Sequence, residues 1–326
     1  MTVKVSRPSI DIRGTLDELN KPSGIAGEAM LRADSVQEQR NLIGAGRKNL
    51  IINGGFDVWQ RGTSFTTSYF ADRFSGNHSG HTTTKSTDVP TGKGFENSAQ
   101  FVGSGSDPYF FQIVEGSATI AGKEATFSFW IKGGLGQCYI FDGGYTAVES
   151  TLIETIGAWT RRSITHAFAT GSYNPLIRIG LPINASNTCH TTGWQLELGS
   201  FATPFEHRSY GEELALCQRY YQVLVSGDDN YWASGHYYNT GLFALTFSFP
   251  STMRTTPTAG YTTGVNWYLI YTRGGADLID GITFNRLHPS GGGADVTAAT
   301  SGVQGSGGTI KTNNPACKIY FDAELY

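Results

Sequence analysis

The sequence has few cysteines and few charged residues for its length. Its 326 residues include four cysteines, and Asp, Glu, Lys and Arg together make up 16% of the chain, below the ~25% typical of soluble proteins. Cys138, Cys189, Cys217 and Cys317 lie far apart and form no CxxC pair. We therefore predict free thiols in a reducing cytoplasm and no disulfide framework. His190 follows Cys189, but nothing nearby completes a zinc site.

An excess of positive charge and long apolar segments are also missing. The formal net charge is −3, which argues against nucleic acid and anionic membranes as partners. The opening MTVKVSRPS lacks the apolar stretch of a signal peptide. No apolar run approaches the ~20 residues that span a bilayer. We therefore expect synthesis in a cytoplasm and no membrane insertion.

Familiar catalytic motifs are missing as well. The chain contains no GxSxG, no P-loop, no HExxH and no GxGxxG followed by a helix. Carboxylate pairs, which cleavage of a glycosidic bond needs, occur at Asp228-Asp229 and at Asp277 and Asp280. Each pair lies beside turn residues, where Asp is favoured for local hydrogen bonds. We therefore predict no catalytic residues and a non-enzymatic chain.

The residues that are abundant favour β structure. Glycine occurs 42 times, and aromatic residues make up 13% of the chain. Aromatic and β-branched side chains fit a pleated sheet, and glycine permits the positive φ angles of tight turns. This much apolar and aromatic material also argues against disorder. A chain of this length suggests two domains and an additional arm.

Residues 1–47 form the predicted arm. Residues 15–18 (TLDE) and 35–38 (SVQE) both match the capping box that begins a helix. Helices this short cannot bury a core alone, so the segment is either a flexible tail or an arm that becomes ordered against a partner. Ile25, Met30 and Leu31 need burial, which favours the arm.

Two β-rich segments follow, and a helix connects them. Residues 48–208 hold several short strand patterns between turn-forming clusters, which predicts a sandwich or jelly roll. Residues 209–222 begin with a capping box at Ser209 and predict the connecting helix. Residues 223–326 form a second β module, in which residues 289–308 are a Gly/Ser/Thr-rich loop and the last nine residues are a strand. The predicted fold class is mainly β: a short helical N-terminal arm, a jelly-roll β-sandwich over residues 48–208, then a linker helix and a C-terminal β module over residues 209–326.

Aromatic residues cluster in the second module. Aromatic faces can stack on sugar rings, and Tyr and Trp lose little entropy when they become ordered at a binding surface. Packing inside a strand pair or between subunits explains the same residues equally well at this stage. The candidate glycan-binding residues are Tyr231, Trp232, Tyr237, Tyr238, Trp267 and Tyr268.

A series of short motifs follows in order through residues 47–326. The series is 48–62 (KNLIINGGFDVWQRG), 72–74 (DRF), 193–199 (GWQLELG), 202–206 (ATPFE), 211–221 (GEELALCQRYY), 253–258 (MRTTPT) and 321–325 (FDAEL). In this order the chain resembles the tail-fibre and appendage proteins of tailed bacteriophages. The first module also resembles jelly-roll carbohydrate-binding modules, in which an Asn-Gly-Gly-Phe-acid segment opens the first strand.

The resemblance implies a homotrimer in a virion, assembled in the host cytoplasm. Residues 1–47 would attach to another virion protein of the tail or capsid, and the C-terminal module would bind host cell-surface polysaccharide. A trimer would also cover exposed strand edges. No cofactor is required, although in some jelly-roll modules the acid of the opening motif binds a structural Ca²⁺. Asp57 is the matching residue here, and Glu197 on the late strand is its possible partner.

Two other functions remain open at this stage. The chain could be a head fibre or capsid decoration protein without an essential receptor role. It could also be a glycan depolymerase, which the carboxylate pairs in turns make the weaker alternative.

Overall fold

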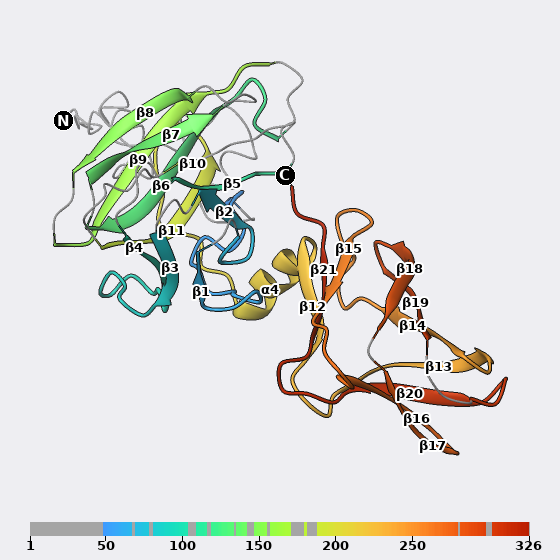
Figure 1. Cartoon of the computed structure of the whole chain (residues 1–326). Helices are drawn as coiled ribbons and strands as arrows, with labels where there is room; N and C mark the ends of the chain where they lie inside the picture. The colour runs from blue at the N-terminus through green and yellow to red at the C-terminus, as the bar shows by residue number, and fades with distance from the viewer. Residues whose placement is uncertain are drawn as a thin grey trace, which may run out of the picture.

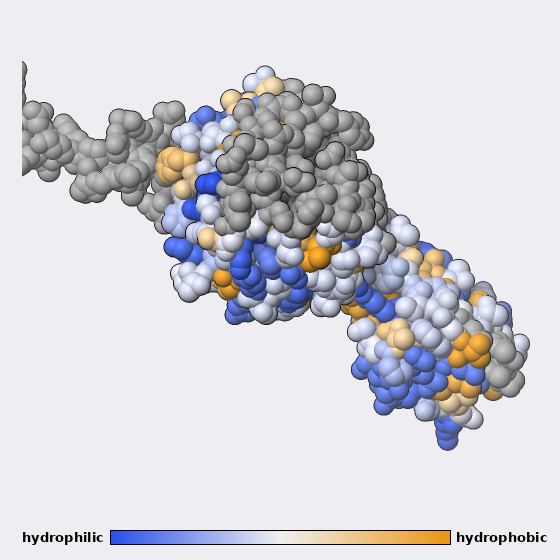
Figure 2. Space-filling model, turned by 60° about the vertical axis from the view of Figure 1, so that its left-hand side comes forward, coloured by the Kyte–Doolittle hydropathy of each residue, from blue (hydrophilic) through white to orange (hydrophobic). Residues whose placement is uncertain are grey.

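The computed structural model describes residues 48–325 with internal gaps at 67–68, 78–80, 104–108, 116–118, 134, 142–146, 155–156, 171–178, 181–187, 280 and 298–301. The predicted arm at residues 1–47 lies outside the described residues. The described chain forms two β modules joined by a short helix (Figure 1). In the space-filling view the modules are two lobes that meet over a narrower region (Figure 2).

The first module is a two-layer β-sandwich. One layer is a six-stranded sheet in the order β1 (Ser64–Phe65), β3 (His81–Ser86), β4 (Ser98–Gly103), β11 (Cys189–Leu198), β6 (Glu124–Lys132) and β9 (Thr160–Ala167). The other layer contains the pair β2 (Phe74–Asn77) and β5 (Tyr109–Gln112), and the sheet β10 (Ile179–Gly180), β7 (Leu135–Phe141) and β8 (Ala147–Glu154). Strands distant in sequence lie side by side, as in a jelly roll. The mainly β prediction is confirmed.

The core of this module lies between the two layers. Phe127, Phe129 and Ile131 of β6 alternate along the strand and point inward, where Phe74 and Phe110 of the other layer meet them. Trp194 is fully buried among these rings and packs edge-on against Phe56, Phe74 and Phe127. These three residues are two apart in the sequence and therefore share one face, because side chains on a strand alternate between the two faces.

The chain itself covers part of the outer face of the six-stranded sheet. Gln195 and Ser128 point outward, yet both are fully buried. The Gln195 amide donates to the backbone oxygens of Thr203 and Pro204. Arg161 donates to the Ser128 hydroxyl and to the Thr203 carbonyl. The segment after β11 therefore folds back over its own sheet and seals a polar layer beneath it.

The opening segment at Leu50–Ile52 is not a strand, although a run of apolar residues is typical of one. Residues 51–55 form bends and turns, and the residues on either side have no regular structure. The side-chain oxygen of Asn49 accepts hydrogen bonds from the backbone NH groups of Ile51 and Leu196, and its amide nitrogen donates to the Trp194 carbonyl. Buried backbone groups need partners, and here an asparagine provides them where a sheet neighbour otherwise would.

The helix α4 (Tyr210–Gln218) follows the first module. Ser209 is its N-cap, and the capping box between Ser209 and Glu212 is present, as the sequence predicts. The helix ends earlier than predicted, because Arg219 is its C-cap and Tyr221 already begins β12. Within the described residues, no helix is long and apolar enough to cross a membrane.

The second module is also built from two packed sheets. The smaller sheet has the order β12 (Tyr221–Ser226), β21 (Lys318–Asp322) and β15 (Thr258–Tyr261). The larger one has the order β17 (Gly275–Ile279), β16 (Tyr268–Thr272), β20 (Gly307–Thr312), β13 (Tyr231–Asn239), β14 (Leu242–Ser248), β19 (Gly291–Thr297) and β18 (Thr283–His288). Phe243, Leu245 and Ile310 of the larger sheet pack in one core with Ile319 and Phe321 of the smaller.

Two predictions for this module are corrected. Residues 289–308 are not one exposed loop, because β19 and the start of β20 lie within them and residues 291–294 are buried. A Cβ on Gly291 would overlap the Phe247 carbonyl, and one on Gly292 would lie 2.8 Å from Leu287. Glycine therefore allows close packing here. The last strand, β21, ends at Asp322, and the chain continues without strand structure to Leu325.

Candidate functional site

Two of the six predicted glycan-binding residues belong to the core. Tyr237 and Tyr268 are both almost fully buried. The Tyr237 hydroxyl donates to Asp277, and the Tyr268 hydroxyl donates to the Thr262 carbonyl at 2.8 Å. Burial raises the pKa of Tyr268 to about 12. The prediction for these two tyrosines is wrong, because their rings fill the space between the sheets and cannot reach a ligand.

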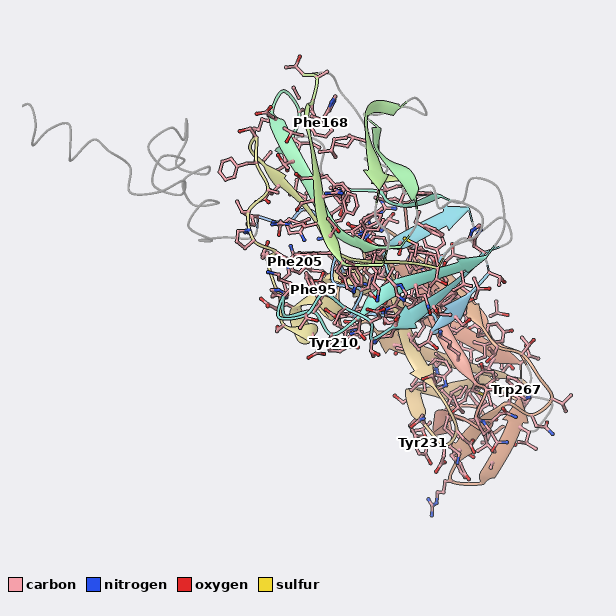
Figure 3. The ribbon with its side chains drawn as sticks, turned by 90° about the vertical axis from the view of Figure 1, so that its left-hand side faces the viewer. Phe95, Phe168, Phe205, Tyr210, Tyr231 and Trp267 are labelled. Carbon is pink, nitrogen blue, oxygen red and sulfur yellow. The ribbon has the colours of Figure 1, made fainter. Side chains whose placement is uncertain are left out.

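The two predicted tryptophans are half-buried. Trp232 packs at the edge of the second core, with its ring centroid 6.4 Å from that of Phe247 and 6.5 Å from that of Phe284. Trp267 packs against the same core from the loop before β16. In Figure 3 the labelled Trp267 lies apart from Tyr231. The structure therefore does not bring these two tryptophans and the exposed tyrosines into one site.

Tyr231 and Tyr271 form the most exposed aromatic pair of the described second module. Tyr231 is 60% exposed and Tyr271 is 41% exposed. Their ring centroids are 6.5 Å apart, and the planes are inclined by 42°. We call this pair the tyrosine platform. Tyr231 belongs to the predicted set, whereas Tyr271 was outside it. Tyr238, also predicted, is 64% exposed.

The platform follows from the register of three neighbouring strands. Lys311 on β20 lies opposite Tyr231 on β13 and opposite Leu269 on β16. Residues two apart on a strand share a face, so Tyr271 lies on the same face as Leu269. A bulge in β13 at Trp232 turns the following residues over, so that Tyr237 points into the core. Only this register places the two tyrosines together.

A lysine and an aspartate complete the surface beside the platform. The Lys311 ammonium lies 5.0 Å from the Tyr271 ring centroid and 5.9 Å from that of Tyr231. It also forms an ion pair with Asp229, and this bond raises the pKa of Lys311. Lys311 therefore stays charged at neutral pH, next to both rings. Exposed rings with adjacent hydrogen-bonding groups can stack on a sugar and bond its hydroxyls.

The predicted calcium pair does not form a metal site. Both carboxylate oxygens of Glu197 already accept hydrogen bonds, one from the Gln195 amide and the Thr203 NH and the other from the Thr203 hydroxyl. Asp57 accepts from the Asn97 amide at 2.8 Å. Among the described residues, no group of three or more His, Cys, Asp and Glu side chains could hold a metal ion. These residues do not fit Ca²⁺, which requires several free oxygen ligands.

The cysteines and the carboxylates in turns have structural surroundings. Cys189, Cys217 and Cys317 are buried free thiols, and burial raises the pKa of Cys189 to about 12. Asp277 accepts a hydrogen bond from the Tyr237 hydroxyl. Asp280 lies outside the described residues. Burial and a raised pKa make a thiol unreactive. The three described cysteines are free, as predicted.

The motif series meets at the junction between the two modules. Gln60 of the first motif donates through its side chain to Asp72 and to the Tyr221 carbonyl at 2.8 Å. Lys318 of β21 donates to the Gln60 carbonyl at 2.8 Å. Arg254 donates to the carbonyls of Ala323 and Glu324. Segments from five of the seven motifs therefore lie together around α4 and the end of β21 (Figure 1).

Buried ion pairs hold this junction together. Arg61 binds Asp322 at 3.0 Å and Glu324 at 3.3 Å. Arg73 binds the other oxygen of Glu324, and both of these side chains are almost fully buried. The guanidinium of Arg61 also lies 3.6 Å above the Tyr221 ring. One carboxylate from the C-terminal segment thus joins two arginines of the first module.

A small pocket opens beside these ion pairs. Its volume is about 140 Å³. On one side Arg219 and Glu115 form an ion pair at 3.2 Å, and the Tyr220 hydroxyl donates to the same Glu115 carboxylate. The lining residues are Leu50, Ile52, Arg73, Gln112, Ile113, Val114, Glu115, Leu216, Arg219 and Tyr220. The pocket lies on the first module's side of α4, away from the tyrosine platform.

Comparisons with known proteins show partial likeness in structure. No protein-family model matches the sequence, and no curated protein matches it. The enzymatically active domain of bacteriophage CBA120 tailspike protein 4 matches with a TM-score of 0.35 and 18% identity, over 46% of this chain and 21% of that chain. This chain thus matches only about a fifth of the tailspike domain.

Two further solved structures overlap about half of this chain. A cyclase from Fischerella sp. TAU has a TM-score of 0.36 and 10% identity, over 49% of this chain and 99% of that chain. TmCBM61 in complex with beta-1,4-galactotriose has a TM-score of 0.32 and 18% identity, over 47% of this chain and 100% of that chain. Likeness at this level assigns no function to this chain.

Proposed function

We propose that this chain is a non-enzymatic structural protein that binds host-surface glycan through the tyrosine platform of its second module. The observation that carries the proposal is the exposed pair of Tyr231 and Tyr271, which lie 6.5 Å apart beside the Lys311–Asp229 ion pair. Contiguous exposed apolar surface with polar groups at its rim often marks a binding site. The proposal assigns no cofactor to the chain.

The rings and the charged pair supply different parts of the binding energy. Each tyrosine face can cover one apolar face of a sugar, and the hydroxyl, ammonium and carboxylate groups can bond its hydroxyls. Single sites of this kind bind weakly. A homotrimer would present three platforms to one polysaccharide, and linked sites bind far more strongly than separate ones.

The ordered motif series supports a place in a bacteriophage virion. The series resembles tail-fibre and appendage proteins, and in that setting residues 1–47 would attach to another virion protein. The homotrimer and the virion location belong to the same proposal. In sedimentation equilibrium, the assembly should have three times the 35.2 kDa of one chain. A monomer at all concentrations would contradict the trimer.

Replacing the platform tyrosines tests glycan binding. We expect Tyr231→Ala and Tyr271→Ala each to weaken binding to target-cell polysaccharide by roughly three- to tenfold, the range for losing one aromatic contact. Saturation-transfer NMR with purified polysaccharide and adsorption of the protein to target cells measure the change.

Tyr238→Ala is the matched control for this test. Tyr238 is also an exposed tyrosine on β13, but it lies seven residues beyond Tyr231 along the strand. Its replacement should leave binding unchanged. If Tyr238→Ala removes binding and the platform variants do not, the glycan surface lies elsewhere on the module.

An architectural role on the phage head is the second candidate function. It is favoured by the position of the motif series, which forms the module junction and not the tyrosine platform. A head fibre or capsid decoration protein would need the junction but no receptor site. Cryo-electron microscopy of particles would separate the two by locating the chain on tail or capsid. Release of reducing ends from polysaccharide would instead indicate a depolymerase.

A further inference from the structure

The two members of the ion pair beside the tyrosine platform differ in how far they are exposed. Lys311 is 13% exposed and is bound to Asp229, whose side chain is 75% exposed. Asp228, the neighbouring residue in the turn, is also exposed. The carboxylate of Asp229 is therefore the exposed member of this pair, and the ammonium group lies largely buried beside the rings. An anion that approached the surface would meet the carboxylate first.

The turn holds Asp229 firmly in this position. The NH of Asp229 donates to the Thr312 carbonyl at 3.1 Å, and the NH of Asn230 donates to the Thr312 hydroxyl at 3.0 Å. The Asn230 amide also donates to the Ser226 carbonyl at 2.8 Å. Asp229 itself has a φ of 57°, a left-handed conformation that Asp adopts more readily than most residues. The backbone of Asp229 is therefore held in place, and the ion pair with Lys311 keeps its carboxylate beside the rings.

We propose that the tyrosine platform selects neutral sugars over acidic ones and that Asp229 sets this selectivity. The inference rests on the glycan-binding function proposed above. A carboxylate accepts hydrogen bonds and donates none, so the exposed Asp229 side chain suits the hydroxyl groups of a neutral sugar. The carboxylate of a uronic acid would meet the exposed carboxylate of Asp229, whereas the Lys311 ammonium group is largely buried and paired with Asp229. Repulsive contacts of this kind are a common source of specificity.

Matched pairs of oligosaccharides test this selectivity on the full chain. Each pair consists of a hexose oligomer and its uronic acid, such as glucose with glucuronate, galactose with galacturonate and mannose with mannuronate. We expect the neutral member to bind at least about tenfold more tightly, which corresponds to about 1.4 kcal/mol. Equal or tighter binding of the acidic member at low salt would overturn the proposal.

The variant Asp229→Asn should change the preference. Its amide keeps the size of the side chain but releases Lys311, which can then pair with a sugar carboxylate. We expect weaker binding of the neutral sugar, tighter binding of the acidic one, and a preference ratio that falls about tenfold or reverses. An unchanged ratio would overturn the role of Asp229.

One further variant and the two platform variants distinguish a failure of the selectivity from a failure of the proposed function. Arg273 is an exposed cation in the turn after β16, and Arg273→Gln should leave the preference ratio unchanged. A shift as large as that of Asp229→Asn would show that Asp229 is not the residue that sets selectivity. If Tyr231→Ala and Tyr271→Ala leave binding of both sugars unchanged, or if no pair binds at millimolar concentration, the proposed function fails at this surface and the selectivity fails with it.

Discussion

Asp72 is a single residue whose chemistry depends on its place in the junction. It is fully buried, and burial raises its pKa to about 7, partly opposed by Arg61 and by hydrogen bonds from Gln60. One carboxylate oxygen accepts the Gln60 NH and side-chain amide, and the other has no partner. A buried charge with an unpaired oxygen is costly, and protonation reduces this cost because it removes the charge.

The raised pKa predicts that Asp72 makes the fold less stable as the pH rises. Between its ordinary pKa of 3.8 and about 7, Asp72 is ionised in the unfolded chain but protonated in the fold. Rising pH then favours the unfolded chain by up to roughly 1.4 kcal/mol per pH unit from this group. Above about 7 the penalty is constant. We expect Asp72→Asn to remove this part of the pH dependence in urea unfolding between pH 5 and pH 8.

The difference between wild type and variant isolates Asp72 from the other titrating groups. Asp228→Asn serves as the control, because it removes one carboxylate from an exposed turn. The prediction fails if Asp72→Asn and the wild type lose stability in parallel over this range.

Among the elements, β19 departs most from its sequence pattern. Its Gly-Gly-Gly start is typical of a loop, yet the strand pairs with β14 and β18 inside the larger sheet. The glycines allow Phe247 and Leu287 to pack closely over the strand. Glycine inside a strand often marks such a close approach, but a sequence window cannot reveal which side chain approaches.

This arrangement predicts that Gly291→Ala is destabilising. The new Cβ would overlap the Phe247 carbonyl, and overpacking of this kind costs typically ~1–3 kcal/mol. Chemical denaturation measures the loss. Gly241→Ala is the control, because a Cβ at Gly241 meets nothing within 4 Å. Equal stability of the two variants would mean that residue 291 is not held between strands.

At the scale of the whole molecule, the junction connects the two modules through buried charge. Figure 1 shows β16 and β20, which carry Tyr271 and Lys311, on the side of the second module away from the first. The ion pairs of Arg61 and Arg73 with Glu324 lie at the opposite end, next to α4. A rigid junction would transmit the position of the first module to the binding surface.

Loss of Glu324 should uncouple the modules. In Glu324→Ala the buried Arg73 has no carboxylate, and breaking a buried pair typically costs ~3–5 kcal/mol. We expect the single unfolding transition of the wild type to split into two, with the second module unfolding separately. Circular dichroism and tryptophan fluorescence in denaturant would follow both steps.

The matched control for this prediction is an exposed ion pair. Arg286 is 62% exposed and pairs with Asp295 at 2.9 Å. Exposed pairs contribute at most ~1 kcal/mol, so Arg286→Ala should change stability little. If the two variants unfold alike, the Glu324 pairs do not couple the modules.

The sequence by itself determined the fold class, several strands of the first module and the start of the helix. These features depend on local patterns: alternation in β6, turn residues between strands, and the capping box at Ser209. Such patterns are visible in the sequence because each depends only on residues that lie close together along the chain. The prediction that the described cysteines are free also came from the sequence, because they lie far apart and form no CxxC pair.

Only the tertiary structure decided which tyrosines are exposed and what the motif series does. Tyr237 and Tyr238 are neighbours on one strand, so one must point inward and the other outward, and the bulge at Trp232 decides which. The partners of Arg61 and Arg73 lie some 250 residues away along the chain. Such pairings depend on how the two modules pack against each other, and no local pattern encodes that packing.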